Sequence, residues 1–264
     1  FVLVLGIQGK GHNERRFSVP WSAPAPRMRD MVRVIKAIWH SWQTGERPHY
    51  EGEHYQVTLM TPNYVPEPLH GPSPPITLAA VGPAMLGVAA RECDGVRLHP
   101  FSTRRYLEQV AMPILTKGIN RGVGQRRYFE VSGGGFVATG ATNEAVAKAF
   151  EWVRQRIGFY GSTRAYWPVF AAHGLENLGE KLNHMAKHGQ WSEMTAAVDD
   201  DVVHLFAAVG RHDCLTQAIE MRFGGLIDSL SIGMPADATN SPPPELIQDI
   251  QRIPSAFEAF SRAI

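Results

Sequence analysis

Short apolar runs alternate along this chain with amphipathic helical segments, and this alternation limits the possible folds more than any other feature. Five runs have the length and composition of strands: FVLVLGI (1–7), ITLAAV (76–81), GVRLH (95–99), FEVSGGGFVA (129–138) and LIDSLSI (226–232). Short aliphatic runs that are separated by helical patterns are typical of βα units. The sequence therefore predicts an α/β fold with a parallel sheet.

Apolar residues spaced three and four positions apart identify the helices between these strands. The clearest case is 28–42, where Met28, Val32, Ile35 and Trp39 recur at this spacing with charged residues between them. Further helices are expected over 84–92, from the cap Thr103 to about 118 with a kink at Pro113, from Asn143, after the cap Asp213 as far as Gly224, and over 245–253. Six prolines in 62–75 predict a stiff surface connection, and 158–205 is helical in composition without an expected strand.

Two architectures satisfy the alternation, a doubly wound sheet and a (β/α)8 barrel. The dinucleotide-binding form of the doubly wound sheet carries GxGxxG after its first strand, and no such motif follows 1–7. A barrel requires eight strands, of which the sequence predicts about five. The residues alone leave both architectures open.

The composition excludes several classes of protein. The chain has 264 residues, 19% of them charged, and a formal charge of +1, which gives no field to attract nucleic acid or an anionic membrane. The longest apolar run, Phe1 to Leu5, is far shorter than the roughly 20 residues of a membrane span, and no basic segment precedes it as in a signal peptide. Cys93 and Cys214 lie far apart without partners at metal-ligand spacing, which favours a reduced, cytoplasmic protein without a resident metal.

Gly82 and Pro83 follow the second expected strand at once, so a helix begins at the carboxyl end of the sheet, where barrel active sites lie. The free N–H groups of Gly82, Ala84 and Met85 would bind a phosphate there, whereas Pro83 has no N–H to donate. The alternative is a tight turn that needs Gly and Pro for its geometry alone.

Gly6, Ile7 and Gln8 end the first expected strand at the same edge of the sheet. A glycine at this point permits the close approach of a planar ring, and the amide groups of Gln8 can form hydrogen bonds with it. The alternative is a glycine that only begins a loop.

Charged residues crowd the loop that follows, which contains His12, Glu14, Arg15 and Arg16. Two adjacent arginines suit an anionic substrate or the acidic tail of a cofactor, and a Glu or His beside a reduced ring suits proton donation. The commoner alternative is a solvated charged loop.

Three further features carry weaker signals. His99 ends the third expected strand, where a histidine either lines a pocket or has a structural role. Asp199, Asp200 and Asp201 lack a partner at ligand spacing and are more typical of a helix cap than of a metal site. The glycines at 133–135 lack the ending of a phosphate loop and indicate a strand that another group approaches closely.

Three segments together resemble the luciferase-like monooxygenase family, and within it the deazaflavin-dependent oxidoreductases. They are FVLVLGIQGKGHNERRFSVPWSAPAPRMRDMVRVIKAIW (1–39), PPITLAAVGPAMLGVAARECDGVRLHPF (74–101) and the stretch from Gly158 through IGFYGSTRAYWPVF to WSEMTAAVDDDVVHLFAAVG. The resemblance implies a TIM barrel and places Phe1 at its fourth strand. It therefore implies a single domain over 1–264 that holds an incomplete barrel, with insertions near 43–75 and 158–205.

The resemblance also implies a function, namely hydride transfer between coenzyme F-420 and a small organic substrate. The cofactor-binding residues would be Gly6, Ile7, Gln8, Ala80, Val81, Gly82, Pro83 and Ala84. His12 and Glu14 are the candidates for acid–base catalysis, and Arg15, Arg16 and His99 for contact with the substrate or an anion. The alternatives are an FMN-dependent monooxygenase that uses molecular oxygen and a non-catalytic barrel fragment, and a homodimer is one assembly open to the chain.

Overall fold

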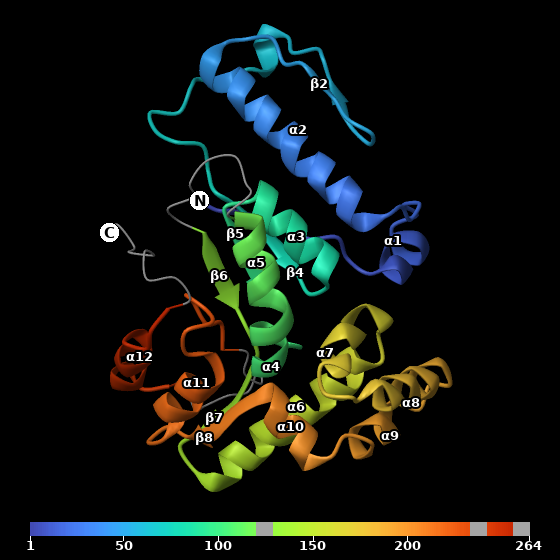
Figure 1. The fold of residues 1–264 in the computed structure, drawn as a ribbon, viewed down its shortest axis with the longest axis vertical. Coiled ribbons are helices and arrows are strands. Elements are labelled where there is room, and N and C mark those ends of the chain that lie inside the picture. The colour runs from blue at the N-terminus through green and yellow to red at the C-terminus, as the bar shows by residue number, and fades with distance from the viewer. Residues whose placement is uncertain (120–128, 233–241, 256–264) are drawn as a thin grey trace.

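Four parallel strands form the centre of the molecule in the computed structural model, which describes residues 1–119, 129–232 and 242–255 (Figure 1). The strands of the described residues are β1 Leu3–Leu5, β2 Tyr50–Glu51, β3 Gln56–Val57, β4 Ile76–Ala80, β5 Gly95–Leu98, β6 Glu130–Gly133, β7 Phe136–Gly140 and β8 Ala207–Arg211. The α-helices are α1 Lys10–Arg16, α2 Pro24–Thr44, α3 Pro83–Glu92, α4 Arg104–Tyr106, α5 Met112–Ile119, α6 Asn143–Gly161, α7 Trp167–Ala171, α8 Glu176–Lys187, α9 Trp191–Ala196, α10 Asp200–Phe206, α11 Leu215–Phe223 and α12 Pro244–Gln251.

The central sheet has the order β1-β4-β5-β6, and every neighbouring pair in it is parallel. Leu5 lies opposite Leu78, Ala80 opposite Leu98, and Leu98 opposite Gly133. The carboxyl ends of the strands therefore meet at one edge. This arrangement confirms the predicted α/β fold with a parallel sheet, although the parallel strands of the described residues do not close into a barrel.

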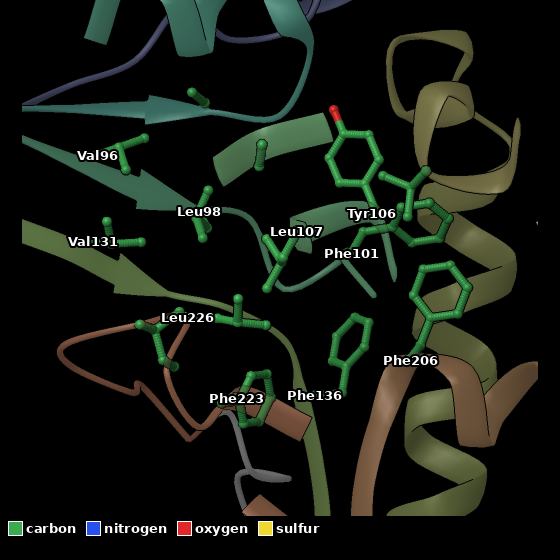
Figure 2. Packing of buried hydrophobic residues seen from close by; sticks show 14 of the residues in the cluster. Val96, Leu98, Phe101, Tyr106, Leu107, Val131, Phe136, Phe206, Phe223 and Leu226 are labelled. Atoms are coloured by element: carbon green, nitrogen blue, oxygen red, sulfur yellow. The ribbon is translucent and has the colours of Figure 1, made fainter. Parts of the chain in front are cut away.

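Close packing of α3 and α5 covers one face of this sheet. A side chain at Gly118 of α5 would lie 2.4 Å from the Cβ of Ala90 in α3, so only glycine permits this approach. Figure 2 shows the core continuing from Leu98 of β5 to Leu107, which lies in a π-helical turn between α4 and α5. Pro113, at which a kink was predicted, follows this turn directly, and a residue without an N–H group favours such a departure from α-helical bonding.

The predicted strand over 129–138 is two strands in two sheets. Gly133 and Gly134 have φ values of 96° and 119°, which L-residues rarely adopt, and they break the run between β6 and β7. β7 pairs in parallel with β8. The sequence analysis missed β8 because it follows α10 without a turn residue, directly after the stretch assigned as helical.

The predicted strand over 226–232 is wrong, because the structure has only a single bridge there, between Ser132 and Ser229. The Asp228 carboxylate accepts a hydrogen bond from the N–H of Val131 at 2.7 Å, and the N–H of Asp228 donates to the carbonyl of the same residue. The Asp228 carboxylate thus accepts the bond that a backbone carbonyl of a paired strand would accept. The regular strand pairing therefore stops after one bridge.

Two local predictions at helix ends had different outcomes. Thr103 caps α4 as predicted, because its Oγ1 accepts the N–H of Tyr106 at 3.1 Å. Asp213 does not cap α11, since its carboxylate pairs with Arg211 and the helix begins after Cys214. The predicted stop at Gly224 is confirmed.

The predicted helix over 28–42 is α2, and it begins earlier, at Pro24. A hairpin of β2 and β3 packs on it, on the side of the molecule away from α6–α10 (Figure 1). The buried carboxylate of Asp30 accepts hydrogen bonds from the Tyr50 hydroxyl and from the N–H groups of His54 (2.6 Å) and Tyr55 (3.0 Å). These bonds fix the hairpin to α2.

Among the described residues, no helix combines the length and the apolarity that crossing a membrane requires.

Candidate functional site

The ends of β1 and β4 carry the residues that were predicted to bind a cofactor, and the end of β5 beside them leads to His99. Gly6 follows β1, and a Cβ at this glycine would lie 3.6 Å from the Cβ of Ala79 in the adjacent strand. Ala80 ends β4 beside Leu98 of β5. Ligands of α/β proteins bind at this edge of a parallel sheet.

The end of β4 leads straight into the exposed start of a helix. Gly82 is the N-cap residue of α3, with no side-chain cap and no acidic residue in the first turn. A Cβ at Gly82 would meet no atom within 4 Å, so open space adjoins it. The Tyr106 hydroxyl donates to the carbonyl of Val81 at 2.6 Å, and burial raises the pKa of Tyr106 to about 12. This bond ties the end of β4 to the core.

The loop after β1 has a strained backbone. Gln8 has a φ of 55°, in the left-handed region that residues with a side chain rarely enter. The Asn13 side-chain amide donates to the carbonyl of Ile7 at 3.0 Å and holds the loop in this shape. Strained residues of this kind cluster at binding and catalytic sites.

The four charged residues of this region lie on α1, a short helix where the sequence predicted an irregular loop. His12, Glu14, Arg15 and Arg16 are all exposed. Glu14 lies 3.8 Å from Lys10 of the same helix, and the Arg16 guanidinium lies over the neighbouring Phe17 ring at 5.7 Å. Both contacts are with residues in or next to α1. Neither connects these side chains to the strand ends.

His99, by contrast, is enclosed at the end of β5. Its ring lies 4.5 Å from the Tyr160 ring and 4.7 Å from the Tyr166 ring, measured between centroids. Nδ1 accepts the N–H of Phe101 at 3.0 Å, so the neutral ring carries its proton on Nε2. Burial lowers the pKa of His99 to about 4. The site therefore offers a neutral imidazole that can donate one hydrogen bond through Nε2.

The two tyrosines beside His99 were not predicted as site residues from the sequence. Tyr160 lies at the end of α6 and Tyr166 in a 3₁₀ turn, both within the stretch 158–205. The aromatic residues in the run GFYGSTRAY were the one sign of a functional role that the sequence offered. The run does not show that these rings contact the end of β5.

A pocket of about 190 Å³ lies beside the end of β1, and we call it the β1 pocket. It is lined by Gly6, Ile7, Asn13, Val19, Pro20, Trp21, Ser22, Pro24, Arg27, Met28, Met31 and Tyr55. Tyr55 comes from the hairpin, and its hydroxyl accepts a hydrogen bond from Arg27 Nε at 2.9 Å. The pattern over 28–42 predicted only the apolar face of an amphipathic helix, and it gave no sign that the start of α2 lines a pocket.

A larger hollow, of about 630 Å³, lies at the opposite edge, beside Ile76 at the start of β4 and Asp94 before β5. The amino-terminal edge of strands in this architecture serves stability rather than chemistry. We therefore assign the candidate site to the carboxyl edge.

Asp199 is the N-cap residue of α10, as predicted, although its side chain makes no capping hydrogen bond. Asp200 and Asp201 lie in the first turn, and Asp200 pairs with Arg154. In 1–119, 129–232 and 242–255, no three metal-binding side chains gather closely enough to hold an ion.

Comparisons with known proteins agree with this architecture. A family described as luciferase-like monooxygenase matches residues 1–228. An uncharacterised protein of Mycobacterium tuberculosis is 41% identical over 227 residues, which cover 86% of this chain and 67% of that protein. A 5,10-methylenetetrahydromethanopterin reductase of Archaeoglobus fulgidus is 25% identical over 224 residues, which cover 82% of this chain and 62% of that protein.

Among solved structures, the coenzyme F420 dependent tetrahydromethanopterin reductase from Methanopyrus kandleri superimposes with a TM-score of 0.71 at 18% identity. The superposition covers 96% of this chain and 73% of that one. The likeness identifies the fold as that of the luciferase-like TIM barrels. With the family match over residues 1–228 and the 41% identical mycobacterial relative, it follows that this chain belongs to the luciferase-like monooxygenase family.

Proposed function

We propose that the chain binds coenzyme F-420 at the carboxyl ends of β1, β4 and β5 and transfers a hydride between this cofactor and a small organic substrate. The observation that carries the proposal is the pair of glycines, Gly6 and Gly82, which follow two adjacent strands at this edge without side chains to obstruct a planar ring.

The residues at the edge fit such a cofactor. Open space adjoins Gly82, and the start of α3 offers free N–H groups and the positive end of a helix dipole, which favour a phosphate oxygen. Residues 80–84 would hold the cofactor from β4, and Gly6, Ile7 and Gln8 would hold it from β1. The bound deazaflavin would supply the redox chemistry, because no protein side chain donates or accepts a hydride readily.

Known relatives support the choice of cofactor. The Archaeoglobus relative is a reductase, and the Methanopyrus structure that shares this fold is described as F420-dependent. Each description belongs to those proteins, and its transfer to this chain is part of the proposal.

The chain's own residues would position the substrate and handle its proton. His99 would donate a hydrogen bond from Nε2 to a carbonyl or hydroxyl oxygen of the substrate, because its Nδ1 already accepts from Phe101. His12 and Glu14 remain the proposed proton donors, and Arg15 and Arg16 remain proposed contacts for an anion. All four are exposed on α1, so they would act from the rim of the site.

The experiment is a titration of the chain with F-420 and with FMN, followed by fluorescence and absorbance. We expect saturable binding of F-420 and a clear preference for it over FMN. Preference for FMN together with substrate-dependent oxygen uptake would instead indicate a monooxygenase, the second candidate that the family name supports. Binding of neither would favour the non-catalytic fragment.

A matched pair of glycine variants tests the proposed edge. Gly82→Val places a branched side chain in the open space, and we expect F-420 affinity to fall at least tenfold with little change in unfolding temperature. Gly71→Val is the control, because a Cβ at this exposed glycine also meets no atom within 4 Å but Gly71 lies in the Pro-rich connection. Equal affinity in both variants would overturn the proposed edge.

A further inference from the structure

The β1 pocket contains polar groups that the fold leaves without partners. Arg27 is half-buried there, and its Nε donates to the Tyr55 hydroxyl at 2.9 Å. Within the described residues no hydrogen bond and no ion pair engages its two terminal nitrogens. Ser22 also lines this pocket, and its hydroxyl oxygen is buried without a hydrogen-bond partner within the same ranges.

The rest of the pocket wall makes these groups significant. Trp21, Met28 and Met31 give it an apolar lining, and the Arg27 guanidinium lies over the Tyr55 ring at 5.9 Å, so the apolar surroundings favour an anionic partner for its terminal nitrogens. The pocket also lies at the start of α2, a 21-residue helix with no acidic residue in its first turn, so the helix dipole adds to the positive potential. Apolar walls with a few convergent polar groups are characteristic of small-molecule sites.

The position of Arg27 is set by a chain of hydrogen bonds that begins at Asp30 on the same helix. Asp30 accepts the N–H of Tyr55 at 3.0 Å and fixes the hairpin, and Tyr55 in turn holds Nε of Arg27. The planar guanidinium is thereby restrained through one nitrogen while its terminal nitrogens remain available. That arrangement suits bidentate recognition of a carboxylate or a phosphate.

We infer that the β1 pocket binds an anionic oxygen group through the terminal nitrogens of Arg27, with the apolar body of the ligand against Trp21, Met28 and Met31. At about 190 Å³ the pocket is smaller than the sites that enclose a drug-sized molecule, so it takes a small acid or one end of a larger ligand. The anionic group is either the carboxylate of a substrate or the acidic tail of the cofactor, and the second source rests on the proposed function.

The test uses two pairs of probes that differ in charge. Calorimetric titration with benzoate and with its neutral analogue benzamide measures recognition of a small carboxylate. Titration with F-420 and with the same deazaflavin chromophore lacking the acidic tail measures recognition of the tail. In the wild-type chain we expect the anionic member of at least one pair to bind at least tenfold more tightly.

Variants assign that preference to Arg27. Arg27→Ala is expected to abolish it, and Arg27→Lys to retain only part, because lysine keeps the charge but not the paired nitrogens. Tyr55→Phe leaves the guanidinium in place but removes its anchor, so we expect a several-fold loss. Arg29→Ala, an exposed arginine on the same helix, is the control and should change nothing.

The readout is the ratio of the affinities for the charged and neutral probes, which a purely structural role of Arg27 would not change. Loss of the benzoate preference in Arg27→Ala identifies a substrate carboxylate, and loss of the tail preference alone identifies the cofactor. A ratio near one in the wild type, or a ratio unchanged in Arg27→Ala, would overturn the inference. Benzoate binding without any deazaflavin binding would overturn only the proposed function.

Discussion

Asp30 and His99 both have lowered pKa values, and the shift has opposite consequences for their charges. Burial acts to raise the pKa of Asp30, but hydrogen bonds from Tyr50, His54 and Tyr55 outweigh it, so the carboxylate stays ionised. At the end of β5, burial alone lowers the pKa of His99 to about 4, so the imidazole stays neutral. Hydrogen bonds stabilise the charged form of Asp30 against burial, whereas His99 avoids the unfavourable burial of a charge by remaining neutral.

The charge that each group keeps suits its role in the structure. An ionised Asp30 organises a hairpin and, through Tyr55, positions the cation of the β1 pocket. A neutral His99 in an aromatic wall can donate a hydrogen bond without repelling or attracting charge. The β1 pocket and His99 adjoin the ends of β1 and β5, two strands that lie about 10 Å apart because β4 is between them.

The largest expected effect is that of removing the carboxylate at Asp30. Asp30→Ala leaves the Tyr50 hydroxyl and two backbone N–H groups without an acceptor, and we expect a loss of about 3 kcal/mol or more in the free energy of unfolding. Arg29→Ala, at the adjacent exposed position, should lie within about 0.5 kcal/mol of the wild type. Denaturant unfolding measures both variants, and equal stabilities would refute the role of the carboxylate as an anchor.

His99 and Asp30 should affect the free energy of unfolding in different pH ranges. The folded-state pKa of His99 is about 4 against an ordinary 6.5, so its protonation opposes folding. The stability due to the neutral ring is complete above about pH 6.5 and is lost as the pH falls to about 4, by at most about 3 kcal/mol. Asp30, with a pKa below its ordinary 3.8, contributes stability above that value that is lost only at lower pH.

His99→Asn isolates the histidine contribution, because the Asn side-chain oxygen can still accept the N–H of Phe101. We expect the slope of stability against pH between 6.5 and 4 to become shallower in this variant, while the loss below pH 4 persists. An unchanged slope would mean that the pKa of His99 is the same in the folded and the unfolded chain. Urea unfolding at a series of pH values gives the measurement.

A smaller effect is expected at the strand between the two sites. Tyr106→Phe removes the hydroxyl that donates to the carbonyl of Val81, and we expect a loss of about 1 kcal/mol in the free energy of unfolding. Because Val81 precedes the proposed cofactor-binding turn, F-420 affinity should fall by several-fold as well. Stability loss with unchanged affinity would show that the turn keeps its shape without this bond.

The features that could be predicted from the sequence are local ones. Gly6 and Gly82 were recognisable because each follows an apolar run directly, and the parallel sheet then brings them to one edge. The environment of His99 was not predictable, since Tyr160 and Tyr166 reach it from more than 60 positions along the chain. The link between Arg27 and Tyr55 escaped for the same reason, as it depends on a hairpin within a stretch that carried no strand pattern.

The same limit explains the errors. In 226–232 the alternation of apolar residues favoured a strand, but a side-chain carboxylate at Asp228 competes with the backbone for the N–H of Val131. The charged residues of α1 attracted a catalytic interpretation by their types alone, and their exposure depends on how the rest of the chain folds around them.

The smallest effects are expected from glycine substitutions that relieve backbone strain at the end of β1. They show whether this strain serves binding. Gln8 and Ser18 both have φ values near 55°, a conformation that glycine adopts without cost. Gln8→Gly and Ser18→Gly should therefore each raise the free energy of unfolding slightly, by about 0.5 kcal/mol, because relief of strain exceeds the added chain entropy. Only Gln8 lies in the proposed cofactor-binding loop, so Gln8→Gly should weaken F-420 binding several-fold while Ser18→Gly leaves it unchanged. If both variants bind F-420 as the wild type does, the side-chain amide of Gln8 has no part in binding and the strain at this position is structural.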